Sequence, residues 1–222
     1  IIRGMAAGDA LTSETAPVFS HLPVMLHSAV GGLAIKPGGV YVDCTAGGGG
    51  HSEAIAEHLS GGGLLIAIDR DADAIEACQK RLSRFGDTVK IVHDNYVNLP
   101  AILDDLGIKE IDGILMDLGV SSHQLDTIER GFSYSTDKDA PLDMRMDRSS
   151  PLDASIVVNS YSEDELCRII RDYGEERYAA RIAKRIVEER EREPILTTRR
   201  LSEIIKSAVP AASVQHGAHP AK

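Results

Sequence analysis

The 222-residue sequence contains no tryptophan, 4% aromatic residues and three cysteines. Cys44, Cys78 and Cys167 form neither a C-x-x-C pair nor an even set, which excludes a disulfide framework and favours reduced thiols in a cytoplasmic protein. The apolar runs are no longer than strands, so we expect no membrane partner. The histidines form no metal-ligand grouping with cysteine or carboxylate, so we predict no metal site.

Basic residues are also scarce. There are 24 Lys and Arg against 34 Asp and Glu, for a net charge of −10, which argues against nucleic-acid binding driven by bulk charge. Residues 127–222 nevertheless hold 16 of the 24 basic residues. A local basic face in this second part stays compatible with RNA, because the distribution of charge matters more than its total.

What the sequence does have is a glycine-rich turn between two apolar runs. The pattern predicts a strand over 40–43, a turn at GGGG (47–50), a helix, and a second strand over 64–69. Four glycines let the backbone turn sharply and approach a ligand closely. Asp69 closes the second strand 20 residues after Gly49, a spacing typical of a carboxylate that binds a ribose. The stretch therefore indicates a nucleoside cofactor.

The surrounding pattern predicts a doubly wound α/β sheet. Strands are expected over 40–43, 64–69, 89–92 and 111–117, and helices over 26–33, 52–59, about Asp71 to Leu82, and 99–106. Alternation of this kind favours a parallel sheet, in which ligands bind beyond the carboxyl ends of the strands. Four residues fall at those ends: Asp43, Asp69, Tyr96 and Asp117.

The pattern of the second part of the chain, residues 127–222, predicts helices. No periodicity is found over 119–153, and a capping box of Ser162 and Glu165 then begins a helix that Gly174 stops. Further helices are expected over 175–192 and about 201–208. We therefore predict four regions: 1–20 as a flexible segment or expression remnant, 21–126 as the cofactor domain, 127–215 as a helical substrate domain, and 216–222 as the return to the sheet.

Several strings are specific enough to indicate a family. They include GGGGHS (47–52), DLGVSSHQLD (117–126) and PLDMRMD (141–147), with further matches at 21–24, 68–71, 129–133, 173–177 and 219–221. Together they resemble the MraW/RsmH family of S-adenosylmethionine-dependent methyltransferases, which modify the N4 amino group of a cytosine in the decoding region of 16S ribosomal RNA. Members of that family are longer. We therefore expect this chain to be truncated, with more sheet after Lys222 and the helical domain inserted into a Rossmann-like methyltransferase sheet.

The resemblance implies S-adenosylmethionine as the cofactor. Asp69 would bind the ribose, and Tyr96 would lie beside the adenine. The full implied cofactor set is Gly49, Gly50, His51, Asp69, Tyr96, Asp117 and Gln124. The plainer alternatives are a tight turn that needs positive φ, and for Asp69 an ordinary helix cap, a role that Asp71 fills more naturally.

The sequence indicates the catalytic residues less directly than the cofactor site. A cytosine N4 amine is a poor nucleophile, so the enzyme must orient it and accept its proton. Asp117, Ser121 and Ser122 are the candidates to receive the amine hydrogen bonds, and local turn capping is the alternative for the two serines.

Candidate RNA contacts lie in the second part. Arg145 belongs to a loop that would fold over the site, and Arg177, Arg181, Lys184 and Arg185 would contact phosphates. The alternatives are an internal salt-bridge network for the loop and a solvated face for the helix. The implied partner is 16S ribosomal RNA in the small subunit. Formation of a homodimer through an open sheet edge is left undecided.

Three rival functions remain open. A nicotinamide-dependent oxidoreductase is disfavoured because Thr45 takes the place of an early glycine and no G-x-G-x-x-G register is present. A non-catalytic cofactor-binding or assembly fragment would bind cofactor without turnover. A methyltransferase acting on protein or on a small molecule would share the cofactor domain and differ in its substrate.

Overall fold

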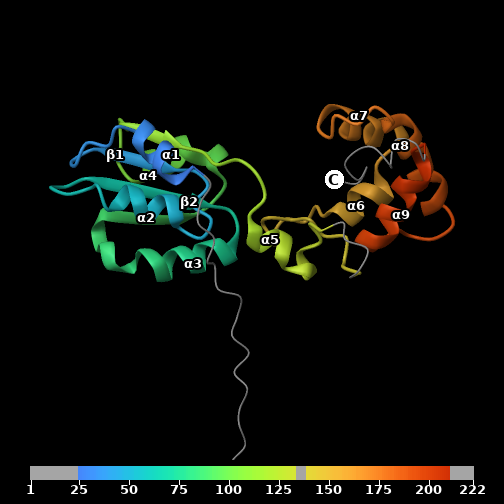
Figure 1. The fold of residues 1–222 in the computed structure, drawn as a ribbon, viewed down its shortest axis with the longest axis horizontal. Coiled ribbons are helices and arrows are strands. Elements are labelled where there is room, and N and C mark those ends of the chain that lie inside the picture. Colours follow the sequence, from blue (N-terminus) through green and yellow to red (C-terminus); the bar gives the residue numbers. More distant parts are fainter. Residues whose placement is uncertain (1–24, 134–138, 211–222) are drawn as a thin grey trace, which may run out of the picture.

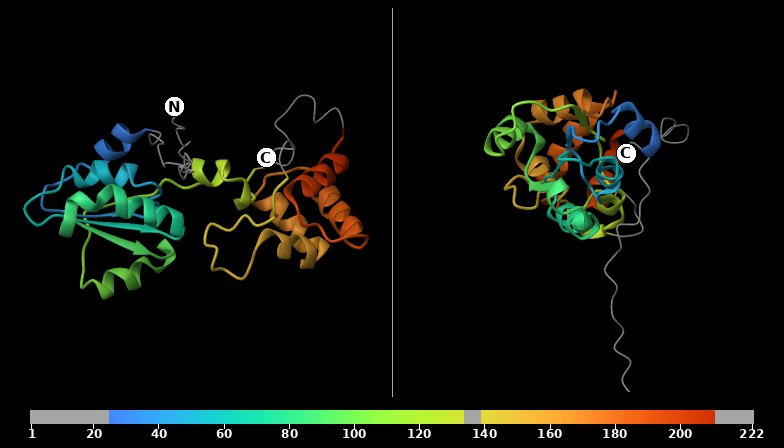
Figure 2. Two further views of the ribbon diagram at one scale, coloured as in Figure 1. Left: turned by 90° about the horizontal axis from the view of Figure 1, so that it is seen from below. Right: turned by 90° about the vertical axis from the view of Figure 1, so that its left-hand side faces the viewer.

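The computed structural model describes residues 25–133 and 139–210. It shows an α/β unit and a helical unit, joined by the segment that contains the short helix α5 (Ser122–Asp126) (Figure 1). The left view in Figure 2 shows the same division along the long axis. The expected terminal regions, 1–20 and 216–222, lie outside the described residues. Within the described ranges, no helix combines the length and apolar character that a bilayer crossing requires.

The α/β unit is built on one parallel sheet. Its strands are β1 (Val40–Asp43), β2 (Leu64–Asp69), β3 (Val89–His93) and β4 (Gly113–Leu115), in the order β3-β2-β1-β4. Helices lie on both faces, so the predicted doubly wound, Rossmann-like α/β class is confirmed. The carboxyl ends of all four strands meet at one edge, which is where such sheets bind ligands.

Alternate side chains along each strand separate two apolar layers. Tyr41 and Leu65 face α1 (Leu26–Gly32), α2 (Gly50–Ala56) and α3 (Ala72–Leu82). Val42 and Ile66 face the opposite layer, with α4 (Leu99–Asp105). The period of two along buried strands produces this division. Short 3₁₀ turns complete the connections: η1 (Ser83–Thr88), η2 (Tyr96–Asn98) and η3 (Ile128–Arg130).

Two expected elements of the α/β unit differ from their predicted bounds by two residues or more at both ends. The strand predicted over 111–117 is only Gly113–Leu115, because its partner β1 ends at Asp43 and the Asp117 backbone N–H then donates to the Thr45 hydroxyl instead (2.7 Å). Asp117 therefore lies two residues beyond the strand. The helix predicted over 52–59 begins two residues earlier and ends at Ala56.

The helical unit contains α6 (Ala154–Ser160), α7 (Glu163–Asp172), α8 (Ala179–Arg190) and α9 (Thr198–Ala208). Leu166, Ile182 and Ile204 come from three of these helices and meet in one core. The capping box of Ser162 and Glu165 is confirmed at the start of α7. Leu142 also enters this core, and the segment before it pairs with the start of α9.

The start of one expected helix is corrected here, and two short helices were not predicted. The helix predicted to begin at 175 begins at Ala179, because Glu175 adopts a left-handed φ of 51° that no helix continues. Arg177 therefore precedes α8. Helices α5 and α6 were not predicted, since five and seven residues are too short for a clear periodicity.

Candidate functional site

A cleft of about 560 Å³ opens at the carboxyl ends of the strands. Its volume lies in the range usual for small-molecule sites. It brings together eight of the residues singled out from the sequence: Gly50, His51, Asp69, Tyr96, Asp117, Ser121, Ser122 and Gln124. The cleft therefore unites segments that are far apart in the chain, from Cys44 to Met146.

The glycine turn forms one wall of the cleft. Gly47 and Gly49 have φ values of 52° and 79°, in the left-handed region that favours glycine. A Cβ on Gly49 would lie 3.2 Å from Cδ of Arg81 and 3.4 Å from Sγ of Cys78. These two side chains also hold the turn from below, since Arg81 donates to the Gly48 carbonyl (2.9 Å) and Cys78 to the Gly47 carbonyl (3.3 Å).

The end of β1 contributes a buried carboxylate and the start of α2 a buried imidazole. Asp43 is fully buried and accepts hydrogen bonds from the Ser52 hydroxyl (2.7 Å) and the Thr45 backbone N–H (3.1 Å). Burial raises the pKa of Asp43, and these bonds oppose the rise. His51 is 6% exposed, and its Nε2 has no hydrogen-bond partner among the described residues. A buried polar atom beside a cleft is a natural contact for a ligand.

Asp69 is positioned by the backbone on both sides. Gly47 N–H donates to its Oδ2 (2.8 Å) and Asp71 N–H to its Oδ1 (2.9 Å). Burial raises its pKa, and the backbone hydrogen bonds oppose the rise. Asp71, not Asp69, caps α3 by accepting from the Asp73 N–H (3.1 Å), as the sequence indicated. Asp69 thus keeps acceptor capacity on a wall of the cleft.

The wall contributed by α5 is set by a capping box. Ser121 Oγ accepts from the Gln124 N–H (3.1 Å), and the Gln124 side chain accepts in return from the Ser121 N–H (3.0 Å). The turn-capping role considered for the serines is therefore present at Ser121, although Ser121 and Ser122 both line the cleft. Tyr96 lies at the edge, 41% exposed.

Arg145 does not line the cleft. Its guanidinium forms a two-pronged ion pair with Asp143 (2.9 and 2.6 Å) and donates to the Ser150 carbonyl (2.7 Å). These bonds lower the pKa of Asp143. The internal ion pair, considered above as the alternative for this loop, is what the structure contains. Met146 from the same loop does reach the cleft.

The other proposed RNA contacts lie on the helical unit and do not line the cleft. Arg181 and Lys184 are exposed on α8. Arg177, ahead of the helix, places its guanidinium over the Tyr178 ring, 4.7 Å from the centroid. Arg185 pairs with Glu189 (3.0 Å).

Glu189 is the centre of a cluster that the sequence did not indicate. It is 6% exposed and also pairs with Arg192 (2.8 Å) and Arg200 (2.5 Å). Helical spacing relates Glu189 to Arg185, but Arg200 comes from α9 and only the fold brings it close. The cluster groups three partly exposed guanidiniums on one side of the helical unit.

Comparisons with known proteins show the family of the chain. Residues 18–222 match the model of the MraW methylase family. The chain is similar to proteins named ribosomal RNA small subunit methyltransferase H, with 52% identity over 204 residues in Symbiobacterium thermophilum, 54% in Lachnospira eligens and 53% in Clostridioides difficile. Each match covers 92% of this chain, and the chain spans 64–65% of the length of these relatives.

Proposed function

The chain belongs to the MraW methylase family, and from this premise we propose that it uses S-adenosylmethionine to methylate the N4 amino group of a cytosine in the decoding region of 16S ribosomal RNA, within the small subunit. The observation that carries the proposal is the cleft, where residues from the glycine turn, the end of β2 and α5 line one cavity. The cavity lies where parallel α/β sheets bind nucleoside cofactors.

The residues of the cleft fit this cofactor. Asp69 offers a preoriented carboxylate for the two ribose hydroxyls, and Tyr96 offers a ring beside the adenine. We assign the methionine part to the turn at Gly49 and Gly50 and to the unpartnered Nε2 of His51. Asp117 and Gln124 complete the cofactor set. When bound, S-adenosylmethionine supplies an electrophilic methyl group on a sulfonium.

The residues of the chain would orient and deprotonate the amine. The Asp117 side chain is 62% exposed and lies in the cleft, so it can accept a hydrogen bond from an N4 amine and take up the proton that leaves. The hydroxyls of Ser121 and Ser122 line the same cavity and can hold the amine in line. The target base would have to leave its stack to enter.

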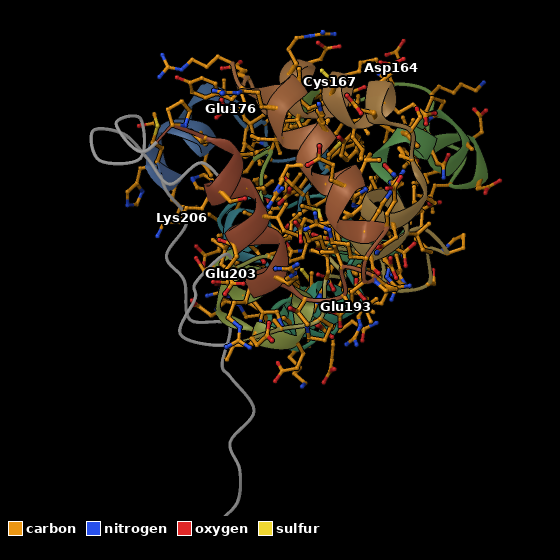
Figure 3. The ribbon with its side chains drawn as sticks, turned by 90° about the vertical axis from the view of Figure 1, so that its right-hand side faces the viewer. Asp164, Cys167, Glu176, Glu193, Glu203 and Lys206 are labelled. Atoms are coloured by element: carbon orange, nitrogen blue, oxygen red, sulfur yellow. The ribbon has the colours of Figure 1, made fainter. Side chains whose placement is uncertain are left out.

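Basic side chains of the helical unit are the proposed RNA contacts. Arg181 and Lys184 are exposed, and with Arg177, Arg185 and Arg145 they make up the phosphate-binding set that we propose. Carboxylates also lie at the end of the unit that points away from the sheet. Figure 3 shows four carboxylates around that end: Asp164, Glu176, Glu193 and Glu203.

The test is transfer of labelled methyl from S-adenosylmethionine to small subunits that lack the modification, followed by nucleoside analysis. Label in N4-methylcytidine would support the proposal. Label in ribosomal protein would favour the protein-methylating alternative. Cofactor binding without any transfer would contradict the proposed activity for this chain and favour a non-catalytic cofactor-binding fragment.

A further inference from the structure

Arg130, at the end of η3, is almost completely buried, with 1% of its side chain exposed. Its guanidinium forms a fork with the Asp71 carboxylate, Nη2 to Oδ2 at 2.8 Å and Nη1 to Oδ1 at 3.2 Å. Nη1 also donates to Asp73 (2.8 Å). A buried arginine requires such partners, because an uncompensated charge in the interior is strongly unfavourable.

The same guanidinium holds the loop that leads to the helical unit. Nη2 donates to the backbone carbonyls of Arg145 and Met146, both at 3.0 Å. The neighbouring Gly131 lies so close to this loop that a Cβ there would collide with the Pro141 carbonyl oxygen. The 141–147 loop therefore makes two separate contacts, one with Arg130 and one with Gly131.

Asp71, the partner of Arg130, connects to the cleft in two further ways. Its backbone N–H donates to the Asp69 carboxylate (2.9 Å), and its Oδ2 accepts from Nε2 of Gln124 (2.7 Å). Asp69, Gln124 and Met146 all line the cleft. Three walls of the cavity, from β2, α5 and the loop, therefore meet at one ion pair.

We propose that Arg130 is a positioning residue that holds α5 and the 141–147 loop against the start of α3. In this way it sets the affinity of the cleft for its cofactor. The identity of that cofactor as S-adenosylmethionine rests on the proposed function. Arg130 itself does not line the cavity and acts through Asp71, Gln124 and the loop carbonyls. A purely structural ion pair would instead stabilise the fold and leave the binding constant of the folded protein unchanged.

The test compares Arg130→Met and Arg130→Lys with a matched control. Arg190→Met removes a partly buried arginine that donates to the Val158 carbonyl inside the helical unit, away from the cleft. Dissociation constants for S-adenosylmethionine are measured by calorimetry well below the melting temperature of each variant. Hydrogen exchange of the 141–147 segment is measured without ligand.

Arg130→Met is expected to weaken binding about tenfold, a usual size for coupled sites, with part of the loss recovered in Arg130→Lys. Arg190→Met should bind like wild type. Wild-type affinity in folded Arg130→Met would overturn the proposal, and if that variant does not fold, Arg130→Lys decides in the same way. If wild type binds no S-adenosylmethionine, the proposed function fails instead. Faster hydrogen exchange of the 141–147 segment in the Arg130 variants, but not in Arg190→Met, would still support the proposal that Arg130 holds this loop. Equal exchange in all the proteins would overturn it.

Discussion

His51 and Asp117 lie next to each other in the lining of the cleft, with Nδ1 of the imidazole 3.9 Å from Oδ2 of the carboxylate. The imidazole side chain is 7% exposed and the carboxylate 62%. The pair thus joins the buried start of α2 to the open side of the cavity. Asp117 can be altered with little effect on packing, which makes it the sharper probe of chemistry.

Replacing Asp117 by Asn should lower the rate of methyl transfer roughly a hundredfold, because the amide cannot take up the amine proton. The melting temperature should stay close to that of wild type. Single-turnover kinetics with small subunits measure the rate. Asp126→Asn, on an exposed carboxylate of α5, is the matched control and should be nearly silent. An undiminished rate in Asp117→Asn would remove Asp117 from the catalytic set.

Gly49→Ala should disable cofactor binding. The left-handed backbone adds a strain of about 1–2 kcal/mol, and the new methyl must also displace Arg81 or Cys78 beneath the turn. Gly61→Ala has the same kind of strain, with a φ of 61°, and its methyl meets open space. Both variants should unfold earlier in denaturant, and only Gly49→Ala should lose affinity in calorimetry. Equal affinities would show that cofactor binding does not depend on a glycine at position 49.

Cofactor affinity should rise with pH through the raised pKa of Asp69. Burial raises the pKa of this carboxyl above the ordinary value of about 3.9, so the free protein holds the proton to a higher pH. Ribose hydroxyls donate to the ionised form, and binding therefore releases that proton. Calorimetry from about pH 4 to about pH 8 should show tighter binding that levels off above the pKa. Asp69→Asn should bind weakly without this rise, and affinity that falls with pH would contradict the assignment.

Removing the charges of Arg181 and Lys184 together should weaken binding by a similar factor for every RNA sequence. Phosphate contacts release counterions, so the slope of log affinity against log salt should fall by about one for each phosphate that is no longer neutralised. Lys206→Ala is the control, because Lys206 lies at the end of the helical unit that carries the acidic side chains (Figure 3). A change in slope for Lys206→Ala, with none for the double variant, would contradict the assignment of the RNA contacts to Arg181 and Lys184.

The sequence predicted β1 and β2 to the residue. A glycine cluster precedes each of them, and both strands are nearly continuous apolar runs, as expected for strands that are buried on both faces. The same reasoning overextended β4, because Met116 is apolar but exposed, beyond the last residue that pairs with β1. Chain neighbours cannot show where a partner strand stops. That boundary is decided by tertiary structure.

The cleft residues were predictable because they belong to contiguous motifs, whereas the buried charges were not. Arg130 and Asp71 are 59 residues apart, and either could have been a solvated surface charge. Ser121 and Gln124 show the intermediate case. Their spacing is a capping-box signature that could have revealed α5, but no periodic apolar run follows it.

The ion pairs of Glu189 should contribute to the stability of the folded protein. Replacing Glu189 by Gln leaves three guanidiniums close together without their shared carboxylate. The free energy of unfolding should fall by about 1–3 kcal/mol, because charged hydrogen bonds are removed while solvent screens the partly exposed arginines. Glu188→Gln is the matched control, since Glu188 is 43% exposed and pairs only weakly with Arg185 (3.3 Å). Urea unfolding measures both. Equal stabilities would mean that the arginines do not depend on Glu189, and RNA affinity that rises in folded Glu189→Gln would show that the cluster's guanidiniums reach phosphate.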